Sequence, residues 1–415
     1  MEIQRPFYLE EMVRKQRNGF VKLITGVRRC GKSYLLRTIF KNQLLADGLS
    51  PEAIVEVAFD ERDSRPFCNP DTFYAFAKKK LEEEPKTVFL LDEIQLLEDF
   101  ESVLNGLLGR GAEIYATGSN AKFLSKDIIT EFRGRGDEIH MSPLSFAEYF
   151  SIFKDDKVAR FQEYMVYGGL PLVALATNVE DKIAILNSLY TETYLRDIVG
   201  RNKIRKVSEL ENLLDILSSS IGTLVNPEKL RNTFRSVKHS TITATTITKY
   251  LTYLEDAYLL EAAQRYDIKG KAYIETPQKY YYSDLGLRNA RLNFRQLEET
   301  HSMENIIYNE LRHRKFNVDI GQVTTLDKCA DTYRRKQLEV DFVANKGATR
   351  YYIQSAYMIP DAAKREQEIR SLLKINDTFK KIVITSHTPT PWYDEHGILT
   401  ISIYDFLLNP ESLTW

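Results

Sequence analysis

The stretch Gly26-Val27-Arg28-Arg29-Cys30-Gly31-Lys32-Ser33 fits the pattern G-x-x-x-x-G-K-S at every position. An apolar run at 20–25, typical of a strand, comes directly before it, and a helix-like pattern follows it. Backbone N–H groups at a helix N-terminus bind phosphate oxygens when a strand delivers the loop to that place. The sequence therefore predicts a phosphate-binding loop between a strand and a helix.

Two side chains of this loop suit a nucleoside triphosphate. The ammonium of Lys32 would reach the β- and γ-phosphates, and the hydroxyl of Ser33 would hold Mg²⁺. ATP and Mg²⁺ are thus the expected ligands. The residues expected to contact the nucleotide are Gly26, Val27, Arg28, Arg29, Cys30, Gly31, Lys32, Ser33 and Tyr34.

A second apolar run, at 87–91, ends in the acids Asp92 and Glu93 and is typical of a strand buried on both faces. We expect Asp92 to orient the water shell of Mg²⁺ opposite Ser33, and Glu93 to polarise the attacking water. A GTPase or a small-molecule kinase does not require the second acid. The pair therefore favours an ATPase that transfers phosphate to water.

Two further segments carry candidate catalytic residues with open alternatives. The strand-like run at 113–117 leads into Gly118, Ser119 and Asn120, of which Asn120 or Ser119 would sense the γ-phosphate; the same cluster also suits a plain turn. Arg135, then Arg133, are candidates for an arginine finger that reaches the nucleotide of a neighbouring subunit. Surface ion pairing is an equally good account of these arginines, and a finger requires a homo-oligomer.

The motifs together resemble those of the prokaryotic AAA+ ATPases whose C-terminal half is a domain of unknown function. The likeness covers nearly the whole chain. It implies a P-loop fold of the ASCE type, with a parallel sheet in the order 5-1-4-3-2 and the 113–117 strand between the loop strand and the acid strand. Beyond the phosphate loop it rests on Leu91-Asp92-Glu93-Ile94-Gln95, Thr117-Gly118-Ser119-Asn120, Pro143-Leu144-Ser145-Phe146, Tyr167-Gly168-Gly169-Leu170-Pro171, Tyr194-Leu195-Arg196-Asp197-Ile198 and Glu339-Val340-Asp341-Phe342-Val343.

We expect an α/β chain in four parts. Residues 1–155 would form the AAA+ core, with a lead-in helix before Gly19 and strands near positions 20, 54, 87, 113 and 138. Residues 156–200 would form a helical, lid-like region, in which Arg196 and Asp197 contact the nucleotide or pair with each other. Residues 201–290 would form a winged helix-turn-helix, and 291–415 a restriction-endonuclease-like domain.

The winged-helix prediction rests on a helical face within 243–260 and two strand-like runs, 259–266 and 280–284, around Gly270. Basic residues cluster in this part of the sequence and favour contacts with DNA phosphates. Winged helices also dock proteins, so the fold alone decides neither partner. The basic residues are Arg201, Lys203, Arg205, Lys206, Lys229, Arg231, Arg235, Lys238, Lys269 and Lys271.

The C-terminal part has the order of a nuclease core but lacks part of its chemistry. A helical glutamate, Glu304, precedes a strand with Asp341, and the next strand carries Gln354 and Ala356 where the nuclease pattern has an acid and a lysine. Cleavage of phosphodiesters needs clustered carboxylates for metal and a base for water. We therefore expect no cleavage, unless Glu304 and Glu339 compensate.

Composition sets the remaining limits. The chain has 415 residues, 43% of them hydrophobic and 28% charged, with a net charge of −1, as in ordinary globular proteins. No apolar run reaches membrane-spanning length and no signal-peptide core is present, so we expect a cytoplasmic protein. Cys30, Cys68 and Cys329 are far apart and odd in number, which argues against disulfides and zinc. Cys30 is either a filler residue or a site of alkylation.

The sequence thus predicts an enzyme that hydrolyses ATP to ADP and phosphate. Three roles for this hydrolysis stay open at this point. It would drive a nucleic-acid-associated switch or motor, or gate a protein-interaction module that does not bind DNA, or serve an ATP-dependent nuclease.

Overall fold

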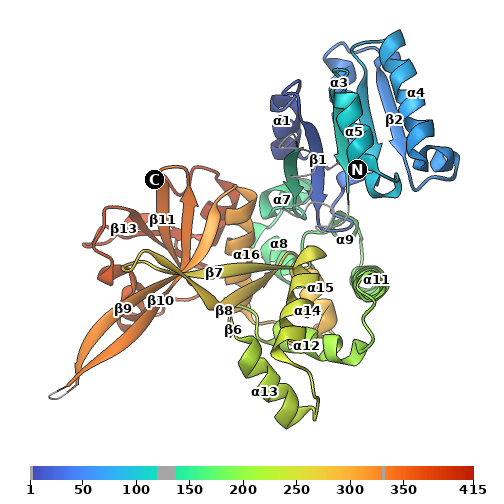
Figure 1. Cartoon of the computed structure of the whole chain (residues 1–415). Helices are drawn as coiled ribbons and strands as arrows, with labels where there is room; N and C mark the ends of the chain where they lie inside the picture. The colour runs from blue at the N-terminus through green and yellow to red at the C-terminus, as the bar shows by residue number, and fades with distance from the viewer. Residues whose placement is uncertain (1–2, 119–135, 330–331) are drawn as a thin grey trace. The chain divides into compact units, whose positions relative to one another are not determined.

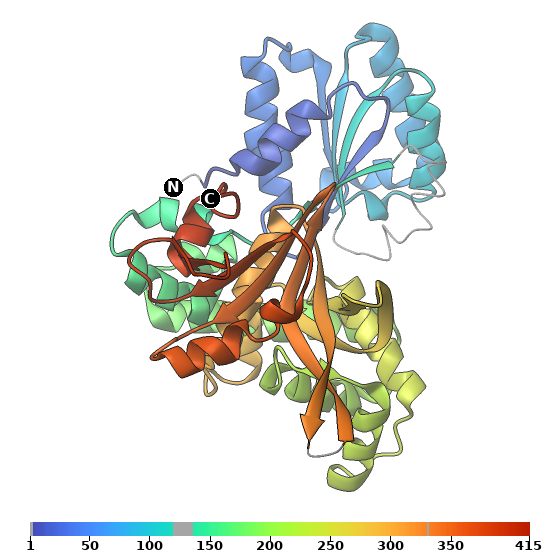
Figure 2. The same cartoon turned by 90° about the vertical axis from the view of Figure 1, so that its left-hand side faces the viewer.

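The computed structural model describes residues 3–118, 136–329 and 332–415. For residues 192–193, 326–329 and 332–334 it describes the backbone only. The chain forms two compact units. One consists of Met1–Pro143 with Asp256–Tyr258, and the other of Leu144–Glu255 with Leu259–Trp415. Figures 1 and 2 show the chain in two views at right angles.

The first unit is built on a five-stranded parallel sheet in the order β2-β3-β4-β1-β5. Counted from the other edge this is 5-1-4-3-2, so the expected order is confirmed, with β4 between the loop strand β1 and the acid strand β3. The strands are β1 (Val21–Gly26), β2 (Ile54–Ala58), β3 (Val88–Asp92), β4 (Glu113–Thr117) and β5 (Gly136–Met141).

Helices cover both faces of this sheet (Figure 1), which explains why every residue of β1 and β3 is buried. On one face, α4 (Pro70–Glu83) and α5 (Phe100–Leu108) pack against side chains such as Phe89 and Ile114. On the other, the ring of Phe40 packs against Tyr115, whose hydroxyl donates to the carbonyl of Met12 in the predicted lead-in helix. The elements of this face are α1 (Pro6–Arg14), α2 (Lys32–Tyr34), the π-helical turn η1 (Leu35–Phe40) and α3 (Lys41–Ala46).

The second unit combines helices with a nine-stranded sheet in the order β13-β14-β12-β11-β10-β9-β7-β8-β6. The strands are β6 (Leu224–Val225), β7 (Leu260–Asp267), β8 (Ala272–Tyr282), β9 (Asn317–Cys329), β10 (Thr332–Lys346), β11 (Thr349–Ala356), β12 (Lys380–Thr385), β13 (Trp392–Tyr393) and β14 (Leu399–Ser402). The strands β9 and β10 continue beyond their neighbours as a two-stranded ribbon (Figure 1).

The helices of this unit begin with α7 (Phe146–Phe153), whose Ser145 and Glu148 form a reciprocal capping box. The others are α8 (Lys157–Tyr167), α9 (Pro171–Ala174), α10 (Val179–Ser188), η6 (Leu189–Leu195), α11 (Arg196–Arg201), α12 (Val207–Ser219), α13 (Pro227–Val237), α14 (Ala244–Asp256), α15 (Leu285–Arg291), α16 (Glu299–His313), α17 (Ala362–Ile369) and α18 (Ile403–Leu408). The helices from α7 to α12 precede the first strand of the sheet, α13 to α16 lie between β6 and β9 in sequence, and α17 and α18 follow β11 and β14.

The hairpin expected around Gly270 exists as β7 and β8, and it does not stand apart. Strand β7 pairs in parallel with β9, so the hairpin and the C-terminal strands share one sheet. Apart from Asp256–Tyr258, the second unit therefore contains the segments predicted as lid, winged helix and C-terminal domain, whose boundaries remain predictions. Among the residues described, no helix has both the length and the apolar character needed to cross a membrane.

Candidate functional site

The phosphate loop connects the end of β1 to the start of α2, and two glycines shape it. Gly26 has φ 123°, and a Cβ added there would lie 1.9 Å from the carbonyl oxygen of Met141 in β5. Gly31 has φ 101° and directly precedes α2. Both positions therefore require glycine, one for close backbone approach and both for a left-handed backbone.

Lys32 is buried beneath this loop. Its Nζ donates to the carbonyl oxygens of Gly26 and Val27, each at 3.0 Å. An ammonium has three donors, so these two bonds orient it and leave one donor for a further acceptor. Within the loop, Arg28 is half-buried, whereas Arg29 and the following Tyr34 are exposed.

Asp92 lies at the carboxyl end of β3, where its carboxylate collects hydroxyl groups from two other elements. Ser33 Oγ donates to Asp92 Oδ1 at 3.0 Å, and Thr117 Oγ1 donates to the same oxygen. Burial raises the pKa of Asp92, against the lowering effect of the hydrogen bonds from Thr117 and Ser33. The predicted metal pair, Ser33 and Asp92, is thus brought together.

Glu93 follows Asp92 at the same edge of the sheet. Its backbone has φ 52°, in the left-handed region that non-glycine residues seldom adopt, and such strain is typical of functional sites. The N–H of Glu93 donates to Thr117 Oγ1 at 3.0 Å, and the side chain of Gln95 donates to its carboxylate. Thr117 therefore bridges the carboxylate of Asp92 and the backbone of Glu93.

Arg5 supports the phosphate loop from the N-terminal segment. Its guanidinium donates to the carbonyl of Cys30 at 3.2 Å and to the carbonyl of Ser142 at 2.8 Å. The thiol of Cys30 is fully buried and donates to the carbonyl of Met141 at 3.4 Å. Of the two interpretations of Cys30, this burial favours the filler residue, because alkylation requires access to the thiol.

Sequence reasoning missed Arg5 and Thr117. Thr117 is the polar residue at the end of the strand-like run 113–117, and this position next to the acids is a signal that could have identified it. Arg5 left no comparable signal. The sensor candidates Ser119 and Asn120 and the finger candidates Arg133 and Arg135 lie outside the part of the chain that the structure describes.

Comparison with known proteins places this site in a family. The model of an AAA domain matches residues 18–150, and that of a domain of unknown function matches 158–298. An uncharacterized protein of Haemophilus influenzae is 33% identical over 417 residues, which cover 98% of this chain and 99% of that protein. An uncharacterized protein of Methanocaldococcus jannaschii is 29% identical, over 93% of this chain and 85% of its own.

The chain belongs to the family of AAA-domain proteins that carry a domain of unknown function C-terminal to the AAA domain. The predicted family is confirmed. Solved structures with some similarity include Orc1 of Aeropyrum pernix in complex with DNA, 11% identical over 71% of this chain and 93% of that chain, with a TM-score of 0.31. Another is AMPPCP-bound DnaA of Aquifex aeolicus, 13% identical over 60% of this chain and 85% of that chain, with a TM-score of 0.26.

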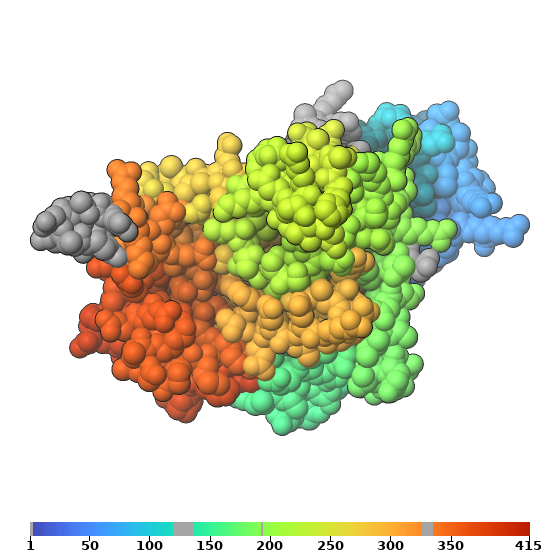
Figure 3. Space-filling view, turned by 90° about the horizontal axis from the view of Figure 1, so that it is seen from below, coloured from blue at the N-terminus to red at the C-terminus, as the bar shows by residue number. Residues whose placement is uncertain are grey.

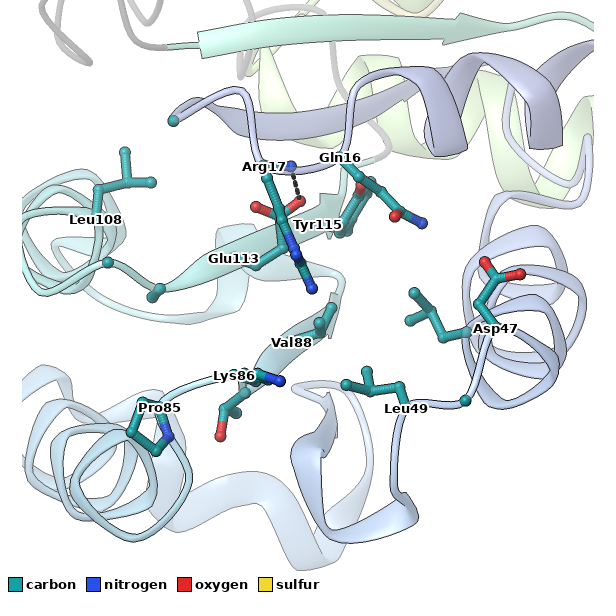
Figure 4. A pocket seen from close by; sticks show the side chains of 16 residues that line it. Gln16, Arg17, Asp47, Leu49, Pro85, Lys86, Val88, Leu108, Glu113 and Tyr115 are labelled. Carbon is teal, nitrogen blue, oxygen red and sulfur yellow. Dashed lines mark hydrogen bonds between the residues drawn. The ribbon is translucent and has the colours of Figure 1, made fainter.

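The AAA domain also has a cavity of about 570 Å³ at the amino ends of its strands, whereas the phosphate loop lies at their carboxyl ends. It is lined by residues at or near the amino ends of β1, β3 and β4, among them Arg17, Val88 and Glu113. Figure 4 shows the side chain of Arg17 extending into it from above Val88, with Lys86 below Val88. This cavity is separate from the predicted nucleotide site.

Beyond the AAA domain, the described structure brings together the residues predicted for a degenerate nuclease site. Asp341 in β10 accepts hydrogen bonds at Oδ2 from the side chain of Gln354 and the N–H of Ser355, both at 2.8 Å. Glu304 in α16 and Glu339 in β10 meet at Lys279 of β8, which sequence reasoning did not select. Ala356 is buried and brings no amine.

The helical region that follows the AAA domain in sequence contains Arg196 and Asp197. The sequence predicts that these two residues either contact the nucleotide or pair with each other. The carboxylate of Asp197 pairs with Arg201 at 3.0 Å, one turn further along the helix. The predicted alternatives did not include this partner.

Proposed function

We propose that the AAA domain binds ATP with Mg²⁺ and hydrolyses it to ADP and phosphate. The observation that carries this proposal is the convergence of Ser33 and Thr117 on one oxygen of Asp92, beside the buried Lys32. Hydroxyl and carboxylate oxygens are the ligands that Mg²⁺ prefers, so Ser33 and Asp92 fit the ion. When bound, Mg²⁺ would neutralise charge on the phosphates.

The chain's own groups divide the work as follows. Two N–H groups of the Lys32 ammonium donate to the loop carbonyls, and the third donates to the phosphates. The backbone N–H groups of the loop bind the phosphate oxygens. Glu93 accepts a proton from the attacking water, and the bond from its N–H to Thr117 fixes its position next to Asp92. Arg135, with Arg133 second, remains the candidate to complete the site from a neighbouring subunit.

The test separates binding from turnover. Lys32→Ala is expected to lose ATP binding, whereas Glu93→Gln keeps it and stops hydrolysis, measured by nucleotide titration and phosphate release. Glu98→Gln, an exposed acid shortly after Glu93, is the matched control and keeps both. Equal loss of ATP affinity in the Lys32 and Glu93 variants would remove Glu93 from the catalytic role.

We propose, as the use of this hydrolysis, a nucleic-acid-associated switch. The elements α12, β6, α13, α14 and the hairpin β7–β8 follow one another in the order of a winged helix, with β6 paired to β8, which supports that prediction. Helix α13 carries exposed basic residues, and Figure 3 shows it on an open face of the second unit. They are Lys229, Arg231 and Arg235, followed by Lys238 at the C-cap, and Arg231 pairs with Glu228 at 3.1 Å.

Protein docking is the competing use of the same surface. Val237, at the end of α13, is 65% exposed, so an apolar side chain lies among the basic ones on this surface. Titration with DNA at low salt distinguishes the two, because phosphate contacts respond to salt and an apolar contact does not. Cleavage is not part of the proposal, because Gln354 and Ala356 stand where the nuclease pattern has an acid and a lysine.

A further inference from the structure

The ammonium of Lys279 is buried between carboxylates that other elements supply. Its Nζ lies 2.9 Å from Glu304 Oε1 in α16 and 2.7 Å from Glu339 Oε1 in β10, and the residue is 3% exposed. The hydroxyl of Tyr281 donates to the same oxygen of Glu304 at 2.7 Å. Lys279 is therefore the centre of this cluster, although its strand β8 is separated from β10 by β7 and β9 in the sheet.

The charges around Lys279 explain why a cation is held there. Burial would lower the pKa of Lys279, but the charges of Glu304, Asp341 and Glu339 outweigh burial and raise it, so the amine stays protonated. Burial likewise works against the charged form of Glu304, and the charge of Lys279, with hydrogen bonds from His301 and Tyr281, reverses this and lowers the pKa of Glu304. Each buried charge is thus stable because the other is present.

Asp341 completes the cluster without a direct bond to the amine. Burial and the nearby charge of Glu304 raise the pKa of Asp341 well above its usual range, against the lowering effect of Lys279. One ammonium therefore contacts both Glu304 and Glu339, of which Glu339 is partly exposed to water, and Asp341 is held by the donors of Gln354 and Ser355. The cluster needs no second cation.

We propose that the Lys279 ammonium is the resident cation of this carboxylate cluster, in the place that a divalent metal ion would occupy, and that the native chain binds no metal ion there. A divalent ion would have to displace an ammonium of like charge from its two carboxylates. In agreement, no group of three or more His, Cys, Asp or Glu side chains among the described residues is arranged to hold a metal ion.

The proposal predicts that removal of the amine opens the cluster to metal. In Lys279→Met the carboxylates of Glu304 and Glu339 remain, and two carboxylates with water suffice for a hard divalent cation. We expect nucleotide-free, full-length Lys279→Met to bind one Mn²⁺ at least about tenfold more tightly than the wild type does. The measurement is calorimetric titration with MnCl₂, checked by electron paramagnetic resonance of the free ion.

Two matched proteins make this test specific. Lys271→Met removes an exposed lysine near the start of the same strand and should bind Mn²⁺ as the wild type does. The double variant Lys279→Met/Glu304→Gln should lose the new site again. Weak binding of Mn²⁺ at Asp92 is common to all four proteins and is subtracted. A folded Lys279→Met protein with no added Mn²⁺ site would overturn the proposal.

A second measurement covers the case in which Lys279→Met does not fold. Wild type and Asp341→Asn are then compared, and the proposal requires the same Mn²⁺ binding in both, because the native cluster holds none. A Mn²⁺ site that is present in the wild type and lost in Asp341→Asn would show that the carboxylates, and not the ammonium, define the site. It would also reopen the nuclease interpretation.

Discussion

The hydroxyl of Thr117 donates to the oxygen of Asp92 that also accepts from Ser33, and accepts in turn from the N–H of Glu93 at 3.0 Å. One threonine thereby links the end of β4 to both acids at the end of β3. A change in the position of β4 would be passed to Asp92 and Glu93 through this hydroxyl.

The first prediction follows from that bond. Thr117→Val keeps the volume but removes the hydroxyl, so Asp92 loses a donor and the N–H of Glu93 loses its acceptor. A buried polar group left without a partner costs about 1–3 kcal/mol, so we expect turnover to fall by roughly tenfold or more while ATP still binds. The measurement is kcat against ATP affinity.

Its control is a buried threonine at the other end of the acid strand. Thr87 donates to the carbonyl of Glu84 at 2.6 Å, far from the phosphate loop, so Thr87→Val loses a comparable hydrogen bond. We expect it to lower the free energy of unfolding and leave kcat unchanged. Equal loss of kcat in both variants would show that Thr117 acts only through stability.

A second prediction concerns the close approach of β5 to the phosphate loop. Gly26→Ala would place a Cβ 1.9 Å from the carbonyl oxygen of Met141, so the loop or β5 must move. Gly111→Ala is the matched control, because Gly111 has φ 85° but open space around its Cβ position. The control should cost about 1–2 kcal/mol of stability for the left-handed backbone.

Gly26→Ala should cost more than that and also abolish ATP binding, measured by chemical unfolding and nucleotide titration. If the two alanine variants lose equal stability and both bind ATP, the approach of β5 does not shape the loop.

Much of the AAA domain could be predicted from sequence, because its signals are local. The loop motif and the two acids after an apolar run are each contained in a few consecutive residues. The alternation of strand-like and helix-like segments along the sequence predicts the parallel sheet. The missed residues act across long separations. Lys279 meets Glu339 sixty positions further on in the chain, and Arg5 meets the carbonyl of Ser142. No spacing rule connects such pairs.

The motif Gly168-Gly169 shows the same limit and leads to a third prediction. The motif is a helix stop, since α8 ends at Tyr167 with Gly168 as its C-cap. It also encloses Asp284, which accepts from the N–H of Gly169 at 2.7 Å and of Leu287 at 3.2 Å. A Cβ on Gly168 would lie 2.2 Å from Asp284 Oδ1. Burial raises the pKa of this carboxyl to about 6, in spite of the backbone donors.

The sign of the pH effect follows from proton binding. Between its ordinary pKa near 3.8 and about 6, Asp284 is protonated in the folded chain and ionised in the unfolded chain. Stability therefore falls as pH rises through this window and is level above it. A shift of about two units corresponds to about 3 kcal/mol. We expect urea unfolding of Asp284→Asn to show a shallower decline between pH 4 and pH 6 than that of the wild type, because the raised pKa values of Asp92 and Asp341 contribute the remainder.

The control for this prediction is Asp361→Asn, which changes an exposed helix cap whose carboxylate accepts from Lys364. That variant should keep the decline seen in the wild type. A decline as steep in Asp284→Asn as in the wild type would assign the effect to the other buried acids.

The last prediction tests the switch proposal on α13, where several basic side chains face solvent. Lysines and arginines that meet phosphates release counterions from DNA, so affinity falls with salt by a slope of about −0.9 for each phosphate contacted. Joint replacement of Lys229, Arg235 and Lys238 by alanine should make that slope shallower by about 3 and leave basal ATP hydrolysis unchanged. Replacement of three α4 lysines of the AAA domain, Lys78, Lys79 and Lys80, should leave the slope as it is. If the wild type binds neither single- nor double-stranded DNA even at low salt, the switch proposal fails, and the exposed Val237 then favours a protein partner for this surface.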